Sequence, residues 1–240
     1  MDSFSSFLHN LSFMLVPLMA AVVLHEYAHG RVAYFFGDPT AKSLGRLTLN
    51  PLPHIDMYGS IIVPLMLFLI PGGFIFGWAK PVPIDTSKLH KPKRDMAFVA
   101  VAGPLMNLFL AVVSGVILAL LLFIDPTLKE SWPPQPGVGP RGDLQGMLLV
   151  PLTAMALFSM LINIVLFAFN LLPIPPLDGS RVLASILPPK QAMALVRLER
   201  YGFLVVIGLI MLNSYIPILS VYLGSFQDIF FHIFLSNFSS

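Results

Sequence analysis

Long apolar stretches alternate with short polar ones along the whole chain. Five stretches contain no Asp, Glu, Lys or Arg: residues 3–25, 57–79, 96–124, 144–177 and 201–227. Each is longer than the roughly 20 residues that an α-helix needs to cross the hydrocarbon core of a bilayer. The pattern predicts an all-α integral membrane protein that lies in a lipid bilayer.

The second stretch, residues 57–79, differs from the other four. Pro64 and the run Pro71-Gly72-Gly73 interrupt it, and such residues break a spanning helix. We therefore predict a re-entrant or hairpin segment, which is tolerated at membrane depth where protein covers its backbone. A fifth ordinary span is the alternative that hydropathy favours. The other stretches predict about four transmembrane helices, near residues 8–36, 96–124, 147–172 and 201–223.

Composition supports a membrane protein with one domain. Of the 240 residues, 56% are hydrophobic and 11% are charged, against about 25% charged in a soluble domain. The absence of cysteine excludes disulfides, thiolate metal ligands and a cysteine nucleophile. A net charge of +2 is too small to indicate a nucleic-acid partner. Without repeats or a soluble module, residues 1–240 are expected to form a single membrane domain.

Basic residues are concentrated in two segments. Residues 38–96 hold seven Lys and Arg and residues 173–200 hold four, whereas residues 125–147 hold two and both ends of the chain hold none. Loops rich in Lys and Arg remain in the cytoplasm. We expect a multi-pass protein of the cell (inner, cytoplasmic) membrane, with both termini and the 125–147 loop outside and both basic segments inside.

The first span ends in an H-E-x-x-H motif, His25-Glu26-Tyr27-Ala28-His29. Residues four positions apart share one face of a helix, so both imidazoles can bind one metal ion. Glu26 is close enough to take a proton from a metal-bound water without being a ligand. We therefore predict one catalytic zinc ion per chain, with His25 and His29 as ligands and Glu26 as the catalytic base. A polar cluster at a helix end is the alternative.

A catalytic zinc ion needs a third protein ligand and an open position for water. Three prolines between residues 172 and 177 end the preceding apolar helix, and Asp178 follows them. By itself, Asp178 is equally well explained as a ligand or as the N-cap of a following helix. Because Asp178 and the two histidines fall at the inner ends of their spans, we expect Asp178 to be the third ligand and the active site to lie towards the cytoplasm. Glu130 and Glu199 are less suitable, since one is predicted outside and the other follows a basic amphipathic stretch.

Two other polar residues are candidates for contact with a substrate. Asn170 is near Asp178 and can hydrogen-bond a substrate backbone or an oxyanion, but an amide that satisfies the broken helix is an equal alternative. His54 can touch the metal site or a substrate, with a loop histidine bonded to nearby backbone as the alternative. Asn107 is expected to be structural, packing beside Gly103-Pro104 between helices.

The chain resembles the site-2 protease family of intramembrane zinc metalloproteases. Three matches carry the resemblance: His25-Glu26-Tyr27-Ala28-His29, Gly103-Pro104-Leu105-Met106-Asn107, and Asn170 with Pro173 and Leu177-Asp178-Gly179. It implies a three-helix catalytic core within about residues 8–180, zinc held by His25, His29 and Asp178, and Glu26 as general base. Without an appended PDZ or CBS domain, the chain is similar to a compact bacterial or archaeal subgroup.

The resemblance also implies a substrate class. We expect a zinc metalloendopeptidase that hydrolyses peptide bonds in or near transmembrane segments of other membrane proteins, in regulated intramembrane proteolysis or in clearance of membrane remnants. The alternative is a catalytically silent zinc-bound membrane protein that binds transmembrane helices. An inactive relative is expected to lose Glu26 or a ligand, and this chain keeps them all.

Two segments next to this site favour extended structure. Residues 45–50 alternate in polarity, and the proline spacing in residues 80–84 favours strand or polyproline geometry. We expect short β-strands at both places, near the active site. At the other end of the chain, residues 226–234 are rich in aromatic side chains and are expected to form a helix on the outer interface.

Overall fold

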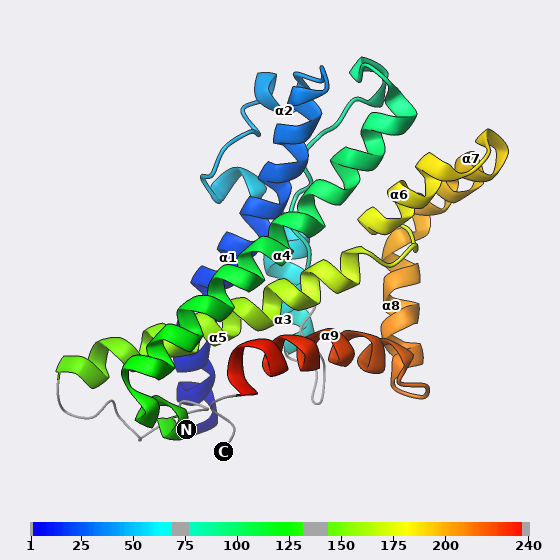
Figure 1. Cartoon of the computed structure of the whole chain (residues 1–240). Helices are drawn as coiled ribbons and strands as arrows, with labels where there is room; N and C mark the ends of the chain where they lie inside the picture. Colours follow the sequence, from blue (N-terminus) through cyan, green and yellow to red (C-terminus); the bar gives the residue numbers. More distant parts are fainter. Residues whose placement is uncertain (1, 69–76, 132–143, 237–240) are drawn as a thin grey trace.

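Three long helices, α1 (Asp2–Phe35), α4 (Pro92–Ile124) and α5 (Leu144–Asn170), cross one another at the centre of the molecule (Figure 1). The computed structural model describes residues 2–68, 77–131 and 144–236. Within these residues, four helical stretches are long and apolar enough to cross a membrane: Phe13–Phe35, Pro92–Ile124, Leu148–Asn170 and Ile218–Leu235. The prediction of an all-α membrane protein with about four spans is confirmed.

Helix α4 lies against α1, α5 and α9 (Ile218–Leu235) because much of its buried surface consists of small residues. Ala100, Gly103, Ala111 and Gly115 are all buried there. Small side chains let helix backbones approach closely, which substitutes for the hydrophobic effect between helices in lipid. A Cβ atom on Gly115 would lie 2.7 Å from the Phe234 ring of α9, so glycine is needed at this crossing.

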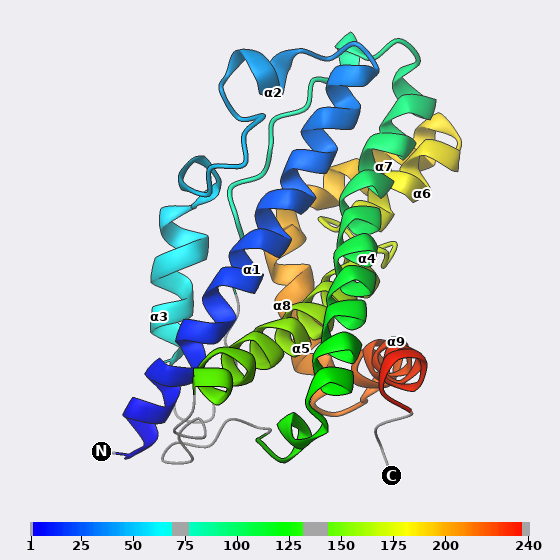
Figure 2. The ribbon, with the colours of Figure 1, turned by 60° about the vertical axis from the view of Figure 1, so that its left-hand side comes forward.

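Residues 57–79 begin and end at the same level of the molecule. The π-helical turn η2 (Met57–Ile62) continues into α3 (Val63–Phe68), and the segment that starts at residue 77 runs alongside α1 (Figure 2). On its return, the Trp78 N–H donates to the Gly59 carbonyl at 3.1 Å, and the Ser60 hydroxyl donates to the Trp78 carbonyl at 2.9 Å. These bonds favour the predicted hairpin over a fifth span; residues 69–76 lie outside the described part of the chain.

The predicted β-strands are wrong: no strand occurs among the described residues, which include 45–50 and 80–84. In the second segment, Pro81 and Pro83 have no N–H to donate, so a ladder would lose alternate bonds. The remaining amides bond elsewhere, since Lys80 N donates to the His54 carbonyl and Val82 N donates to the Glu26 carboxylate. In the first segment, Asn50 N donates to the nearby Thr48 Oγ1, so this amide bonds locally and not to another strand.

The predicted fourth span, residues 201–223, is instead two helices, α8 (Gly202–Asn213) and α9. A side-chain clasp fixes the turn between them: Asn213 Nδ2 donates to Ser220 Oγ at 2.7 Å, and Ser220 N donates to Asn213 Oδ1 at 2.9 Å. Pro217 precedes the first residue of α9 and cannot continue the α8 ladder. Residues 226–234, predicted as an interfacial helix, fall inside α9, which packs against α5 and α4 (Figure 1).

The basic segments gather at one end of the molecule and the chain termini at the other (Figure 1). The first end holds α2 (Thr40–Ser43), the start of α4, α6 (Asp178–Ile186) and α7 (Pro189–Leu198). The remaining short turns are η1 (Leu52–His54), η3 (Thr86–Lys88), η4 (Pro126–Ser131) and η5 (Glu199–Tyr201). This arrangement agrees with the relative placement that the charge pattern predicted.

Candidate metal centre

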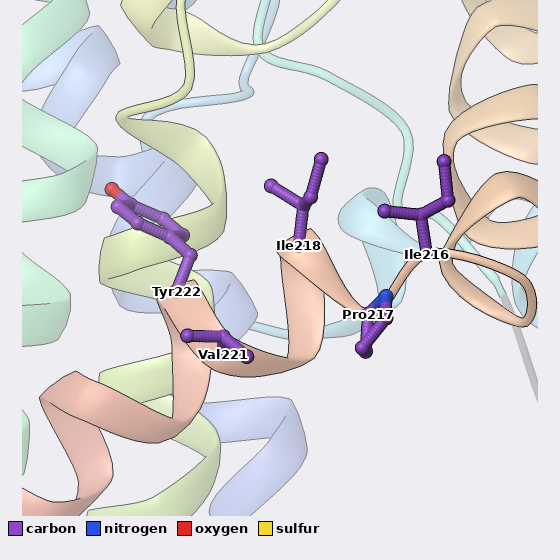
Figure 3. Close-up of a pocket in the computed structure, with 5 residues that line it drawn as sticks. All are labelled: Ile216, Pro217, Ile218, Val221 and Tyr222. Atoms are coloured by element: carbon purple, nitrogen blue, oxygen red, sulfur yellow. The ribbon is translucent and has the colours of Figure 1, made fainter.

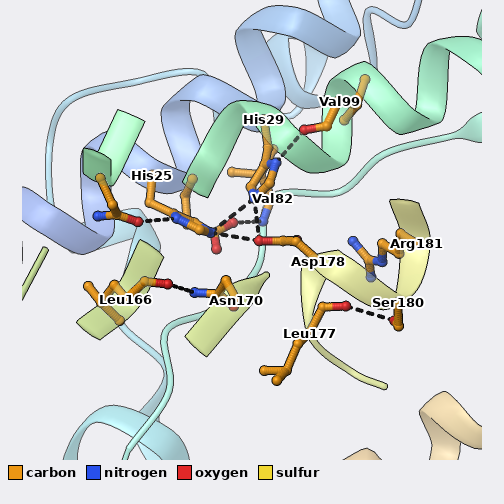
Figure 4. A network of polar contacts seen from close by, with 12 residues as sticks. His25, His29, Val82, Val99, Leu166, Asn170, Leu177, Asp178, Ser180 and Arg181 are labelled. Carbon is orange, nitrogen blue, oxygen red and sulfur yellow. Dashed lines mark hydrogen bonds and ion pairs between the residues drawn. The ribbon is translucent and has the colours of Figure 1, made fainter. Parts of the chain in front are cut away.

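His25, His29 and Asp178 converge in the interior of the helix bundle (Figure 4). The two histidines lie one turn apart on α1, and Asp178 is the first residue of α6. The Nε2 atoms of His25 and His29 lie 3.2 and 3.3 Å from Asp178 Oδ2, and 3.0 Å from each other. All three residues are less than a tenth exposed.

The opposite nitrogen of each imidazole is bonded to α4. His25 Nδ1 donates to Asn107 Oδ1 at 2.5 Å, and His29 Nδ1 donates to the Val99 carbonyl at 2.7 Å. Both partners are acceptors, so both Nδ1 atoms must carry the proton. The two Nε2 lone pairs therefore point at one another and at the Asp178 carboxylate.

This donor set fits a zinc ion. Asp178 Oδ2 is buried and receives no hydrogen bond. Three lone pairs facing one another repel unless a cation lies between them or an imidazole takes up a second proton. In a tetrahedral site with bonds of about 2.0–2.1 Å, two ligand atoms lie about 3.3–3.4 Å apart. The separations of 3.0–3.3 Å are close to that value, and three protein donors leave a fourth position open.

Asp178 reaches the histidines because the loop after α5 packs tightly against the start of α6. A Cβ atom on Gly179 would clash with the Leu171 carbonyl, so only glycine allows this approach. The N-cap of α6 is Leu177, and no side chain caps the helix, so the capping alternative for Asp178 is not realised.

Glu26 lies beside the cluster without joining it. Its Oε2 accepts a hydrogen bond of 2.7 Å from Val82 N, in the extended segment that runs along α1 (Figure 4). The neighbours Pro81 and Pro83 have no N–H, so Val82 supplies the amide at this point of the segment. The Val82 side chain packs on Gly30, where a Cβ atom would lie 3.0 Å from Val82 Cγ1.

The second matched motif, Gly103-Pro104-Leu105-Met106-Asn107, also contacts the candidate metal centre. The sequence analysis did not predict this contact. A Cβ atom on Gly103 would lie 2.6 Å from His25 Nε2, so glycine leaves the room in which the imidazoles meet. Asn107, four residues later, holds His25 Nδ1. Asn107 is buried between helices, as predicted, and its bond to His25 is a contact that the prediction did not include. Its spacing of one helical turn from Gly103 is the signal that places both on the same face of α4.

The two candidate substrate residues lie outside the donor cluster. Asn170 ends α5, and its Nδ2 donates to the Leu166 carbonyl at 3.0 Å, as expected for an amide that satisfies a helix end (Figure 4). His54 is 1% exposed, and its ring pairs through Nε2 with the Thr48 carbonyl at 3.0 Å. These contacts favour the structural alternative for His54 and leave Asn170 half-buried close to the site.

An apolar hollow of 420 Å³ lies at the turn between α8 and α9 (Figure 3). It is lined by Ile216, Pro217, Ile218, Val221 and Tyr222. The Tyr222 hydroxyl is committed to the Ala168 carbonyl at 3.2 Å. The side chains that line this hollow include no His, Asp or Glu, and the group of such residues that could hold a metal ion in the described part of the chain lies between α1 and α6.

Buried side chains that can bind zinc, together with an H-E-x-x-H motif inside a bundle of apolar helices, are the features of a membrane-embedded metallopeptidase. Comparison with known proteins agrees: the model of peptidase family M50 matches residues 13–213. The chain belongs to this family, which confirms the resemblance to site-2 proteases, and it is a zinc metalloprotease.

Two relatives illustrate the match. The protein named "Putative zinc metalloprotease YwhC" from Bacillus subtilis (strain 168) is 36% identical over 233 residues, 93% of each chain. The protein named "Putative zinc metalloprotease Rip2" from Mycolicibacterium smegmatis is 34% identical over 80% of this chain and 64% of its own length. No solved structure matches the chain.

Proposed function

We propose that this zinc metalloprotease cleaves peptide bonds in or near the transmembrane segments of other membrane proteins. The observation that carries this proposal is the position of the donor set. His25 and His29 lie within the apolar stretch of α1, at 8% and 5% exposure, and Asp178 faces them at 7%. A substrate has to bring its scissile bond to that depth, and membrane-spanning segments are the peptides that reside there.

We assign His25, His29 and Asp178 as zinc ligands and Glu26 as the general base. Zinc held there would supply a Lewis acid and lower the pKa of a water molecule towards about 7. Glu26 accepts a proton from the attacking water and passes it to the leaving amine. Its bond to Val82 N fixes one carboxylate oxygen and leaves the other for proton transfer.

Access to this site requires that the substrate is locally extended. In a helix, each carbonyl is bonded to the amide four residues later, so a helical peptide cannot present its carbonyl to a nucleophile without unwinding. Asn170, half-buried at the end of α5, has a side-chain oxygen that can bond a freed substrate amide. Residues 1–240 form one protease domain in this proposal, in line with the relative that matches over 93% of its length.

Cleavage of a model transmembrane substrate tests the function. Purified protein in lipid vesicles is expected to cut such a substrate, to lose activity with a zinc chelator and to regain it with added Zn²⁺. Asp178→Ala should abolish both cleavage and tight zinc retention. Zinc-dependent binding of the segment without any cleavage would instead establish the catalytically silent alternative.

We also propose that the basic end of the molecule faces the cytoplasm and that the termini lie outside. Because the chain has no cysteine, single cysteines at Ser43, Ser87 and Ser131 give a clean labelling assay. An impermeant reagent added to intact cells should label the cysteine at position 131 and spare those at 43 and 87. Labelling at 87 but not at 43 would make residues 57–79 a true span and refute the hairpin topology.

A further inference from the structure

Two buried asparagines connect the candidate metal centre to the middle of the bundle. Asn107 on α4 and Asn163 on α5 are 0% and 1% exposed. Asn107 Nδ2 donates to Asn163 Oδ1 at 2.7 Å and to the Ala21 carbonyl at 3.3 Å. Asn163 Nδ2 in turn donates to the Ser159 carbonyl at 2.8 Å. A chain of amide hydrogen bonds thus runs from α5 through α4 to His25 on α1.

This series of hydrogen bonds can run in only one donor-to-acceptor direction. If the Asn107 amide were rotated by half a turn, its oxygen would face two acceptors, the Ala21 carbonyl and Asn163 Oδ1. The same rotation would turn its NH₂ group towards the His25 proton. Asn163 is fixed likewise, because its donor group meets the Ser159 carbonyl. The fixed direction leaves Asn107 Oδ1 as an obligatory acceptor for His25 Nδ1.

The two histidines differ in how they are held. His29 donates to the Val99 carbonyl, which belongs to the backbone of α4 and cannot rotate independently. His25 donates to a side chain, whose amide is free to rotate unless something fixes it. Asn163 and the Ala21 carbonyl provide that constraint. Buried amides are retained in a membrane bundle at little cost when every donor and acceptor is satisfied.

We propose that Asn107, supported by Asn163, is a positioning residue that fixes the tautomer and ring orientation of His25 so that Nε2 binds the metal ion. The inference rests on the zinc site proposed above and extends it by a second layer that spans three helices. Partners that bond the remote nitrogen of a metal-binding histidine typically change metal affinity by 10- to 100-fold. A role in packing alone predicts no such effect on a folded variant.

Zinc affinity of the purified full-length protein tests this proposal, measured by competition with a chelator of known affinity. Asn107→Ala is expected to weaken Zn²⁺ binding about 10- to 100-fold. Asn107→Asp keeps an oxygen acceptor opposite His25 Nδ1 but turns its second oxygen towards the Ala21 carbonyl and Asn163 Oδ1, so it should lose zinc affinity, though less than Asn107→Ala does. The order of the two zinc affinities is diagnostic. If Asn107 served only in packing, the buried carboxylate of Asn107→Asp would be more damaging than the alanine. Equal binding by Asn107→Ala and the parent would overturn the proposal.

Two further variants separate positioning from general destabilisation. Leu118→Ala removes a buried side chain from the same helix without touching the amide chain and should leave zinc affinity within about threefold. Asn163→Ala keeps Asn107 Oδ1 as the acceptor for His25 but leaves the Asn107 amide free to rotate. Its loss of zinc affinity should therefore be smaller than that of Asn107→Ala and larger than that of Leu118→Ala. This comparison also decides the matter if Asn107→Asp does not fold. A loss for Leu118→Ala as large as that for Asn107→Ala would contradict the proposal.

Cobalt provides a readout that needs no substrate. With Co²⁺ in place of Zn²⁺, the visible absorption bands report ligand geometry, and Asn107→Ala should shift them while Leu118→Ala should not. If the parent binds neither ion, the proposed metal site itself fails. If the parent binds both and the asparagine variants match it, only the positioning role fails.

Discussion

The crossing of α1, α4 and α5 differs from the α8–α9 end of the molecule in what its helices bury. In the apolar windows of α1, α4 and α5, 39%, 33% and 44% of the residues are buried, whereas only 6% are in the window of α9. The first region also buries polar side chains, with His25, Asn107 and Asn163 bonded to one another in series. At the α8–α9 end, the side-chain hydrogen bonds close the turn or anchor a hydroxyl to a helix carbonyl, as those of Tyr222 and Ser225 do.

This difference shows where positional accuracy is needed. Apolar contacts in lipid are non-directional, because the lipid tails are as apolar as the side chains that compete with them. Hydrogen bonds between buried side chains have a required length and direction and hold individual atoms in place. The region that brings the three candidate ligand atoms within 3.3 Å of one another uses such bonds, and the described side chains of α8 and α9 form no series of buried amide bonds of this kind.

The largest expected effect in the polar region is loss of the base. Glu26→Gln keeps the size of the side chain and its bond from Val82 N but removes proton acceptance. Cleavage should slow by about 10²–10⁴-fold, while zinc content and substrate binding remain at the parent level. Single-turnover assays on a model transmembrane substrate, together with metal analysis, give both values. Cleavage by Glu26→Gln at the parent rate would refute the proposed mechanism.

The sequence predicted the candidate metal cluster well because most of the information for it is local. The two histidines and Glu26 lie within five residues on one helix, so the helical period alone sets their geometry. Asp178 required a topological argument, namely that inner ends of spans meet. The structure brings Asp178 to the histidines as that argument predicted.

The parts that were missed depend on packing between distant segments. Asn107 looked structural because nothing in the sequence indicates which helix face meets α1, and the bond to His25 joins residues 82 positions apart. Residues 80–84 are extended, as local propensity favours, but the Val82 N–H donates to the Glu26 carboxylate and not to a neighbouring strand. Residues 45–50 contain a turn at Gly45, where φ is 66°, followed by bends, so they do not form an extended strand. The break at Pro217 was hidden within an apolar run that hydropathy treats as continuous.

A smaller effect is expected at the extended segment that contacts the base. Val82→Pro removes the N–H that holds Glu26 Oε2, in a segment already shaped by Pro81 and Pro83. Because the base then loses its fixed orientation, cleavage should fall on the order of tenfold with zinc content unchanged. Val82→Ala is the matched control, since it trims the contact with Gly30 but keeps the N–H. If the alanine variant is as slow as the proline variant, the side chain matters and the hydrogen bond does not.

The smallest effect is expected at the apolar end. Tyr222→Phe removes the hydroxyl that donates to the Ala168 carbonyl at 3.2 Å and leaves the ring in place beside Phe226. Side-chain hydrogen bonds between membrane helices contribute about 0.6 kcal/mol on average, so the free energy of unfolding should fall by about that amount. Because α9 contributes no group to the donor cluster, the cleavage rate should stay within about twofold of the parent, as RT ln 2 is only about 0.4 kcal/mol. Unfolding in mixed micelles measures the first value and the vesicle cleavage assay measures the second. A tenfold slower cleavage with full zinc content would mean that the α8–α9 turn takes part in handling the substrate, and the functional contrast between the two regions would then be lost.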